Sequence, residues 1–198
     1  MKKKMTAYDL TIGAMFVALM AIGANITAWA PFLSVGGVPL TLQTFIAILA
    51  GVVLGSRLGA FSLLVYMLLG LVGAPIFAQF GGGPSMIVAP TFGFIVSYIM
   101  LAYVAGKLVE MKRSLPMYIT AALVGLAINY LVGTNWMYFA YQLWLDIPEQ
   151  FSYGIVWGWM ALFLVKDLVL AVVAGLFAHR LEKSVLHRTP LRKSQEAA

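Results

Sequence analysis

The sequence predicts an all-α membrane protein with six transmembrane helices and both termini in the cytoplasm. Two features of composition predict the class: 62% of the 198 residues are hydrophobic and only 10% are charged, whereas soluble domains carry about 25% charged residues. The topology follows from the recurrence of apolar segments that can cross about 30 Å of hydrocarbon. Residues 1–198 are therefore expected to form one membrane domain, with cytoplasmic tails at 1–7 and 182–198.

Basic residues set the expected orientation of these segments. The predicted spans lie at 8–30, 41–55, 58–79, 90–110, 116–141 and 154–180. With the N-terminus inside, all but one of the 13 basic residues fall on the same side of the membrane, and the first, third and fifth connections hold none. The positive-inside rule then places both termini in the cytoplasm. This distribution explains the net charge of +6 better than affinity for nucleic acid does.

A cleaved signal peptide is the alternative interpretation of the N-terminal segment. Basic residues precede an apolar run that ends in Ala28-Trp29-Ala30, which looks like a cleavage site. That run is long for a signal peptide, and Pro31 would directly follow the cut. These two features favour a first membrane span.

Two loops rich in glycine and proline, at 31–40 and 80–89, lie on the predicted outer side. Residues 41–55 would span only about 22 Å as a helix, so the preceding loop is expected to dip into the membrane, where it must line a cavity or be covered by protein. We expect Thr41 to cap that helix and Pro75 to kink the end of the third span. The loops are predicted to form the lip of a small-molecule pocket; a flexible turn is the alternative for 80–89.

Small residues predict two close approaches between segments. Ala14 and Ala18 are spaced by four on one helix face, where another helix can come close; packing within this chain and contact with a partner both fit. Gly51, Gly55 and Gly59 repeat the same spacing and predict a tight cytoplasmic turn between the second and third spans.

The last span contains two adjacent charged residues, Lys166 and Asp167. They precede Arg180 by about 21 Å of helical rise, which places them near the middle of the membrane or in its outer half. A charge there costs at least about 2.5–3.5 kcal/mol and normally serves function. An ionised Asp accepts N–H donors such as those of a urea or amide edge, and Lys donates to a carbonyl or carboxylate. The alternative is a self-neutralising pair, or a bond from Asp167 to Asn129.

Several chemistries are excluded or disfavoured. The chain has no cysteine, which excludes disulfides and thiolate chemistry. The Gly106-Lys107-Leu108 segment lacks the remaining residues of a phosphate-binding loop, so ATP hydrolysis is not expected. His179 and His187 both lie at the predicted cytoplasmic end, away from any metal or catalytic grouping. We expect no enzyme activity, metal or cofactor.

Four segments together suggest a known family. They are GVPLTLQTF at 37–45, LGSRLG at 54–59, YMLLGLVGAPIFAQF at 66–80, and GG at 82–83 followed by APTFG at 89–93. In combination they resemble the BioY family, the biotin-binding S components of energy-coupling factor (ECF) transporters, and the similarity extends over nearly the whole chain.

The resemblance implies a role and a set of partners. The chain would lie in a bacterial plasma membrane, capture biotin from outside, and associate with a transmembrane coupling subunit and two ATPase subunits. Ala14 and Ala18 match the small-residue face that S components present to the coupling subunit. Biotin would be the transported ligand rather than a cofactor.

The resemblance also implies a polar site for the ureido ring of biotin. Asp167 would accept the ureido N–H groups, and Lys166 or Asn129 would contact the ureido carbonyl or help to fix Asp167. The family's last helix has an Asp followed three residues later by a Lys. Here Leu170 occupies that later position and Lys166 precedes the Asp, so Lys166 would act from a neighbouring angle.

The rest of the ligand is assigned to aromatic residues and outer loops. Phe80, Trp136 and Tyr141 would surround the thioether ring, and Gln79 or backbone N–H groups would hold the carboxylate. For the aromatic residues at 134–141, a belt at the membrane interface is the alternative. The ureido ring is expected to lie deepest. Further residues expected to contact the ligand are Gln43, Gly82, Thr91 and Tyr98.

Three other functions remain open from the sequence alone. An S component for a different vitamin would bind another ligand in the same kind of pocket. An intramembrane enzyme would turn its ligand over. A small channel or a purely structural subunit would show no saturable ligand binding.

Overall fold

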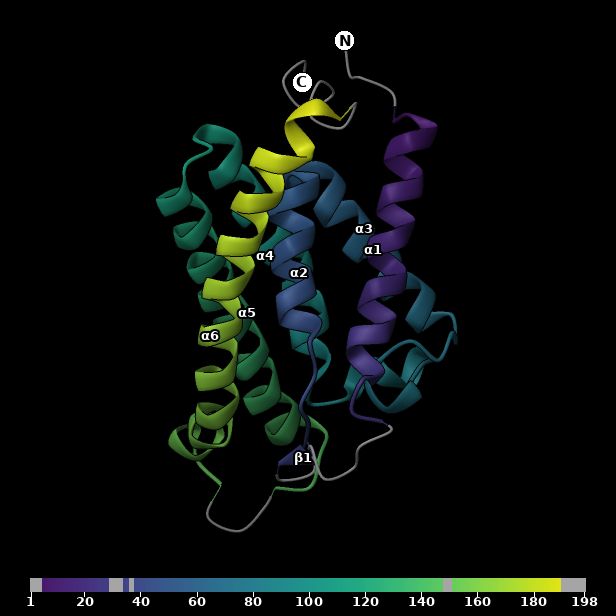
Figure 1. The fold of residues 1–198 in the computed structure, drawn as a ribbon. Coiled ribbons are helices and arrows are strands. Elements are labelled where there is room, and N and C mark those ends of the chain that lie inside the picture. The colour runs from purple at the N-terminus through teal and green to yellow at the C-terminus, as the bar shows by residue number, and fades with distance from the viewer. Residues whose placement is uncertain (1–4, 29–33, 36–37, 148–150, 190–198) are drawn as a thin grey trace.

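The computed structural model describes residues 5–28, 34–35, 38–147 and 151–189. Within these residues six α-helices form one bundle (Figure 1), which confirms the predicted all-α class. The helices are α1 (Ala7–Asn25), α2 (Gln43–Leu54), α3 (Ser56–Leu71), α4 (Phe92–Met111), α5 (Leu115–Leu143) and α6 (Tyr153–Ser184). Of these, α1, α4, α5 and α6 are long and apolar enough to cross a membrane, whereas α2 and α3 have only 12 and 16 residues.

The start of α1 and the end of α6 lie at the same end of the bundle, as an even number of crossings requires (Figure 1). The opposite end, named the loop end here, carries the antiparallel two-residue strands β1 (Ser34–Val35) and β2 (Val38–Pro39). Three short 3₁₀ helices complete the described elements: η1 (Ala78–Phe80), η2 (Pro84–Val88) and η3 (Leu186–Arg188).

Helix α3 departs most from its predicted span, because it ends at Leu71 rather than at residue 79. Gly73 follows at φ +109°, a conformation that a right-handed helix cannot contain. The expected kink at Pro75 was therefore wrong, since the helix has already ended. The expected cap by Thr41 was also wrong: Leu42 is the N-cap of α2 and no side chain caps it.

The first and last helices end at other residues than the predicted spans do. Helix α6 continues beyond the predicted span end at 180 to Ser184, and η3 follows it. Helix α1 ends at Asn25, and residues 29–30 of its predicted span lie outside the described residues. Half of the loop 31–40 lies outside them too, so its entry into the membrane stays a prediction.

Helix α2 is the centre of the bundle and contacts all five other helices. Eleven of its 12 residues are buried, which explains why every residue from Phe45 to Leu54 is apolar or glycine. Small residues bring its neighbours close: a Cβ on Gly51 would lie 2.5 Å from the carbonyl oxygen of Ala102, and a Cβ on Gly106 would lie 2.6 Å from the Cα of Ser56. The backbones of α2, α3 and α4 are therefore in direct contact.

The predicted tight turn between the second and third spans is confirmed. Gly55 alone separates α2 from α3, at φ 84°. The first residue of α3 is fixed from α4, because the carboxylate of Glu110 accepts hydrogen bonds from the Ser56 N–H (2.7 Å) and hydroxyl (2.9 Å). Glu110 thus satisfies an otherwise unpaired N–H group at the start of α3.

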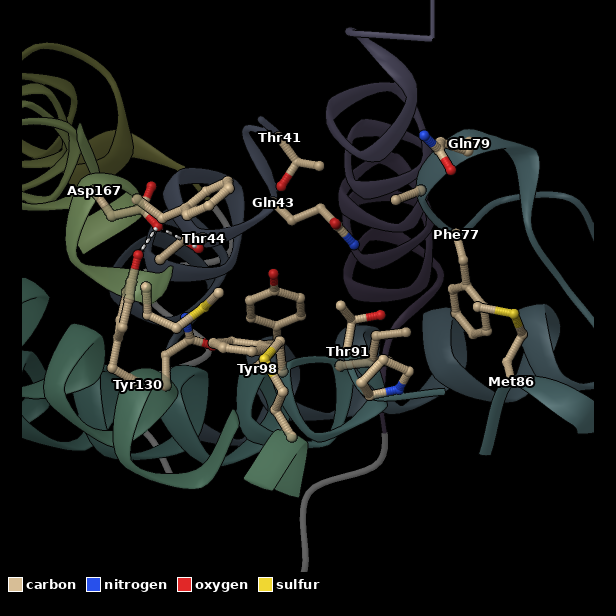
Figure 2. Close-up of a pocket in the computed structure, with 18 of the residues that line it drawn as sticks. Thr41, Gln43, Thr44, Phe77, Gln79, Met86, Thr91, Tyr98, Tyr130 and Asp167 are labelled. Atoms are coloured by element: carbon tan, nitrogen blue, oxygen red, sulfur yellow. Dashed lines mark hydrogen bonds between the residues drawn. The ribbon is translucent and has the colours of Figure 1, made fainter. Parts of the chain in front are cut away.

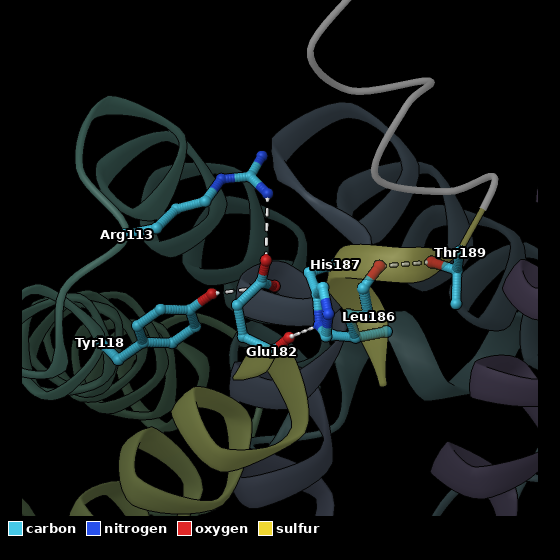
Figure 3. A network of polar contacts seen from close by, with 6 residues as sticks. All are labelled: Arg113, Tyr118, Glu182, Leu186, His187 and Thr189. Carbon is cyan, nitrogen blue, oxygen red and sulfur yellow. Dashed lines mark hydrogen bonds and ion pairs between the residues drawn. The ribbon is translucent and has the colours of Figure 1, made fainter. Parts of the chain in front are cut away.

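A polar network ties α6 to α5 and to the α4–α5 connection at the end opposite the loop end (Figure 3). The Glu182 carboxylate pairs with Arg113 at 3.4 Å and accepts a hydrogen bond from the Tyr118 hydroxyl at 3.3 Å. The ring Nδ1 of His187 lies 3.2 Å from the Glu182 carbonyl oxygen. These contacts hold the last turn of α6 against its neighbours.

Candidate ligand-binding site

A cavity of about 360 Å³ opens between α2, α4, α5, α6 and the segment 77–91 (Figure 2). Its volume falls in the range of small-molecule pockets, which is about 300–1,000 Å³. Asp167 of α6 lies at one side of the view, and Phe77, Gln79 and Met86 lie at the other. The cavity therefore has a charged end and a loop-lined end.

The Asp167 carboxylate defines the charged end, and only 5% of Asp167 is exposed. Its Oδ2 accepts hydrogen bonds from the Tyr130 hydroxyl at 2.8 Å and the Thr44 hydroxyl at 3.3 Å (Figure 2). Its Oδ1 lies 2.9 Å from Lys166 Nζ as an ion pair, but receives no well-directed hydrogen bond from the described residues. A carboxylate has about four acceptor sites, so Asp167 keeps the capacity to accept N–H groups from a ligand.

Lys166 joins the charged end to the start of α2. Its Nζ donates a hydrogen bond to the Thr41 carbonyl oxygen at 2.7 Å while pairing with Asp167. Adjacent helical positions diverge by about 100°, so the long lysine stem bends back to reach its neighbour. The self-neutralising pair considered from the sequence does form. Asn129 accepts instead from the Ser97 hydroxyl at 2.6 Å.

Hydrogen bonds connect Gln43, which lines the cavity, to the start of the loop segment. Its Nε2 donates to the Tyr66 hydroxyl at 3.0 Å, and that hydroxyl donates to the Ile76 carbonyl oxygen at 2.9 Å. Both Gln43 and Tyr66 are buried. The side chain of Gln43 is thereby oriented by α3 and by the start of the loop segment.

The loop-lined end is built on Phe77, which is completely buried. Its ring meets Tyr66 edge-on at 5.5 Å between centroids and occupies the space that a side chain at Gly70 would fill. Phe77, Met86 and Gln79 lie together in Figure 2, away from Asp167. This end offers apolar surface with one amide side chain.

The structure brings together most of the residues predicted for the site. Those that line the cavity are Asp167, Lys166, Gln79, Gln43, Thr91, Tyr98, Asn129 and Tyr141. They come from four helices and the loop segment. The sequence alone did not show that these segments meet at one cavity.

Three predicted site residues lie outside the lining. Phe80 is half-exposed, and Gly82 packs against the backbone of Ala74, whose oxygen would lie 2.5 Å from an added Cβ. Trp136 donates through Nε1 to the Ala89 carbonyl oxygen at 3.1 Å and packs against Phe92. Trp136 thus supports the start of α4, and contacts of these three residues with a ligand stay predictions.

Sequence reasoning missed both hydroxyl partners of Asp167. Tyr130 directly follows Asn129, which was singled out, and Thr44 lies within the TLQTF segment. A buried carboxylate needs donors, so a search for hydroxyl groups on neighbouring spans would have flagged both. Apolar lining residues that were also missed include Phe77, Met86, Met137, Met160 and Phe163.

Comparison with known proteins identifies the family. A Bacillus subtilis (strain 168) protein that carries the name BioYB is 44% identical over 195 residues, covering 98% of this chain and 96% of that relative. A Thermotoga maritima protein named biotin transporter BioY is 37% identical over 180 residues, covering 91% and 99%. A solved structure described as the S-component for biotin from an ECF-type ABC transporter shares the fold, with a TM-score of 0.68 at 22% identity over 91% of this chain and 96% of that chain. The model of the BioY family matches residues 1–187. The chain belongs to the BioY family.

Proposed function

We propose that this chain is the substrate-binding S component that captures biotin from outside the cell for ATP-driven uptake through an ECF transporter. The observation that carries the proposal is the buried Asp167 at the end of a cavity of about 360 Å³. The names of its relatives support biotin as the ligand. In this role the chain is a transport subunit and not an enzyme.

Biotin would lie with its ureido ring at the charged end. The two ureido N–H groups would donate to Asp167, whose Oδ1 receives no well-directed hydrogen bond from the described residues. Lys166 would donate to the ureido carbonyl and stay close to Thr41. Its Nζ lies 2.7 Å from the Thr41 carbonyl oxygen in this structure. Because Lys166 sits beside the Asp rather than three residues after it, it approaches from the side of α2.

The other end of biotin would face the loop segment. Met160, Phe163 and Tyr141 contribute apolar and aromatic surface to the cavity lining. The carboxylate of biotin would lie near Gln79, whose amide nitrogen is a donor. This orientation places the most polar ring of the ligand at the buried carboxylate.

The partners would be a transmembrane coupling subunit and two ATPase subunits, which supply the hydrolysis of ATP. Ala14 and Ala18 are exposed on α1, so they are available to a partner helix rather than consumed in packing within this chain. The chain would lie in a bacterial plasma membrane with both termini in the cytoplasm, as its basic residues indicate.

Calorimetric titration of the detergent-purified chain with biotin tests the function. We expect saturable binding of one biotin per chain. Asp167→Asn should weaken it about 100-fold, because replacing the charged acceptor costs about 3 kcal/mol. The matched control is Asp146→Asn, the same substitution at an exposed position in the α5–α6 connection, which should leave the affinity unchanged.

The outcomes separate the alternatives. Absence of biotin binding by a folded chain, with binding of a different vitamin from a panel, would contradict biotin as the ligand. Tight binding that survives Asp167→Asn would contradict the assigned ureido contact. Recovery of chemically altered biotin would point to an enzyme.

A further inference from the structure

The last residue of α1, Asn25, holds the loop that lines one end of the cavity. Asn25 is only 3% exposed. Its Oδ1 accepts a hydrogen bond from the Phe80 N–H at 2.6 Å, and its Nδ2 donates to the Ala21 carbonyl oxygen at 2.9 Å and more weakly to that of Ile76 at 3.5 Å. One buried amide therefore bridges α1 to both ends of the segment 76–80.

That segment adopts a backbone that needs external support. Gln79 (φ 57°, ψ 35°) and Phe80 (φ 56°) are consecutive residues with side chains in the left-handed region. Such residues are rarely adjacent and persist only where the surrounding structure fixes them. Asn25 Oδ1 accepts the hydrogen bond of the Phe80 N–H. This bond stabilises the left-handed conformation of Phe80.

The supported segment is part of the cavity itself. Phe77, Ala78 and Gln79 contribute to the lining. The Ile76 carbonyl oxygen that faces Asn25 also accepts from Tyr66, which in turn accepts from Gln43 within the cavity. The loop is thus held from α1 on one side and from α3 and α2 on the other.

We propose that Asn25 is a positioning residue that keeps the segment 76–80 closed over the ligand, so that loss of its Oδ1 bond to Phe80 speeds ligand escape. The proposal rests on the proposed function in using biotin as its ligand.

The test uses Asn25→Ala in the full chain, which removes the acceptor of the Phe80 N–H. The matched control is Asn135→Ala: Asn135 makes the same bond to the carbonyl four residues earlier (Leu131, 2.7 Å), but it is only partly buried and its Oδ1 accepts from the Tyr153 hydroxyl rather than from the backbone of the cavity loop. The dissociation rate of radiolabelled biotin is measured by a chase with unlabelled biotin, and hydrogen exchange of the peptide that contains Phe80 is followed without ligand.

We expect Asn25→Ala to raise the dissociation rate about tenfold and Asn135→Ala to have no effect. Exchange at the Phe80 amide should accelerate only in Asn25→Ala. A lower melting temperature with unchanged dissociation and exchange would overturn the proposal, because that is what a merely structural residue produces.

Two provisions keep the test decisive. If the parent chain binds no biotin, the proposed function fails, while the exchange measurement still supports or overturns the contact between Asn25 and Phe80. If Asn25→Ala does not fold, Asn25→Ser replaces it, because the shorter side chain keeps a hydroxyl that falls short of the Phe80 amide.

Discussion

Replacing Tyr130 with phenylalanine isolates one hydroxyl group at the proposed ureido site. The Tyr130 hydroxyl donates to Asp167 Oδ2 at 2.8 Å, and the ring packs edge-on against Phe94 at 6.0 Å between centroids. Tyr130→Phe keeps the ring contact and removes only the donor. Asp167 retains Thr44 and Lys166, so the substitution leaves no isolated buried charge.

The expected magnitude follows from the type of bond. A hydrogen bond to a charged group contributes about 1.5–3 kcal/mol in soluble proteins, whereas bonds between membrane helices average about 0.6 and reach about 1.7 kcal/mol. The charged acceptor and the short distance favour the upper end of the membrane range. Without Tyr130 the carboxylate must be reoriented when biotin binds, so we expect affinity to fall by about 1.4 kcal/mol, or tenfold.

Calorimetric titration of biotin measures this change, and thermal unfolding in detergent checks that the bundle is intact. The control is Tyr103→Phe, because Tyr103 on α4 is half-exposed and should have no effect. An affinity within twofold of the parent chain would show that the hydroxyl does not organise Asp167 for the ligand. Tighter binding would also refute the reasoning, since Tyr130 would then compete with biotin for Oδ2.

Two further predictions concern packing and assembly. Gly106→Ala should destabilise the chain by about 1–3 kcal/mol, lowering the melting temperature by several degrees, because its Cβ meets the backbone of α3; Gly158→Ala on α6, where nothing lies within 4 Å, should be neutral or slightly stabilising, and equal effects of the two would contradict this packing. Ala18→Leu on the exposed face of α1 should abolish co-purification with the coupling subunit while biotin affinity stays within twofold; an intact complex would place the partner elsewhere.

The sequence was sufficient for features that depend on composition and on the cost of burying charge. Hydropathy located all six helices, and the penalty for a charge within the membrane identified Asp167 before any contact was known. The turn at Gly55 followed from small residues beside a basic one. Each of these inferences uses a property that a residue keeps whatever its neighbours are.

The sequence could not predict features that depend on how each helix is rotated about its own axis. A shift of one position turns a side chain by about 100°, so the sequence does not show that Tyr130 faces Asp167 while Trp136 on the same helix faces Ala89. The early end of α3 was missed for a related reason: Gly70 and Gly73 look alike in the sequence, but only Gly73 adopts a positive φ.

The single-residue turn at Gly55 bears on how two short helices are held in a bilayer. Helices α2 and α3 would measure about 18 and 24 Å, and neither reaches across about 30 Å of hydrocarbon. Neither helix is therefore long enough to be stable by itself across the hydrocarbon, and both depend on packing against their neighbours. Because Glu110 of α4 binds the first residue of α3, the pair is fully supported only once α4 has joined the bundle.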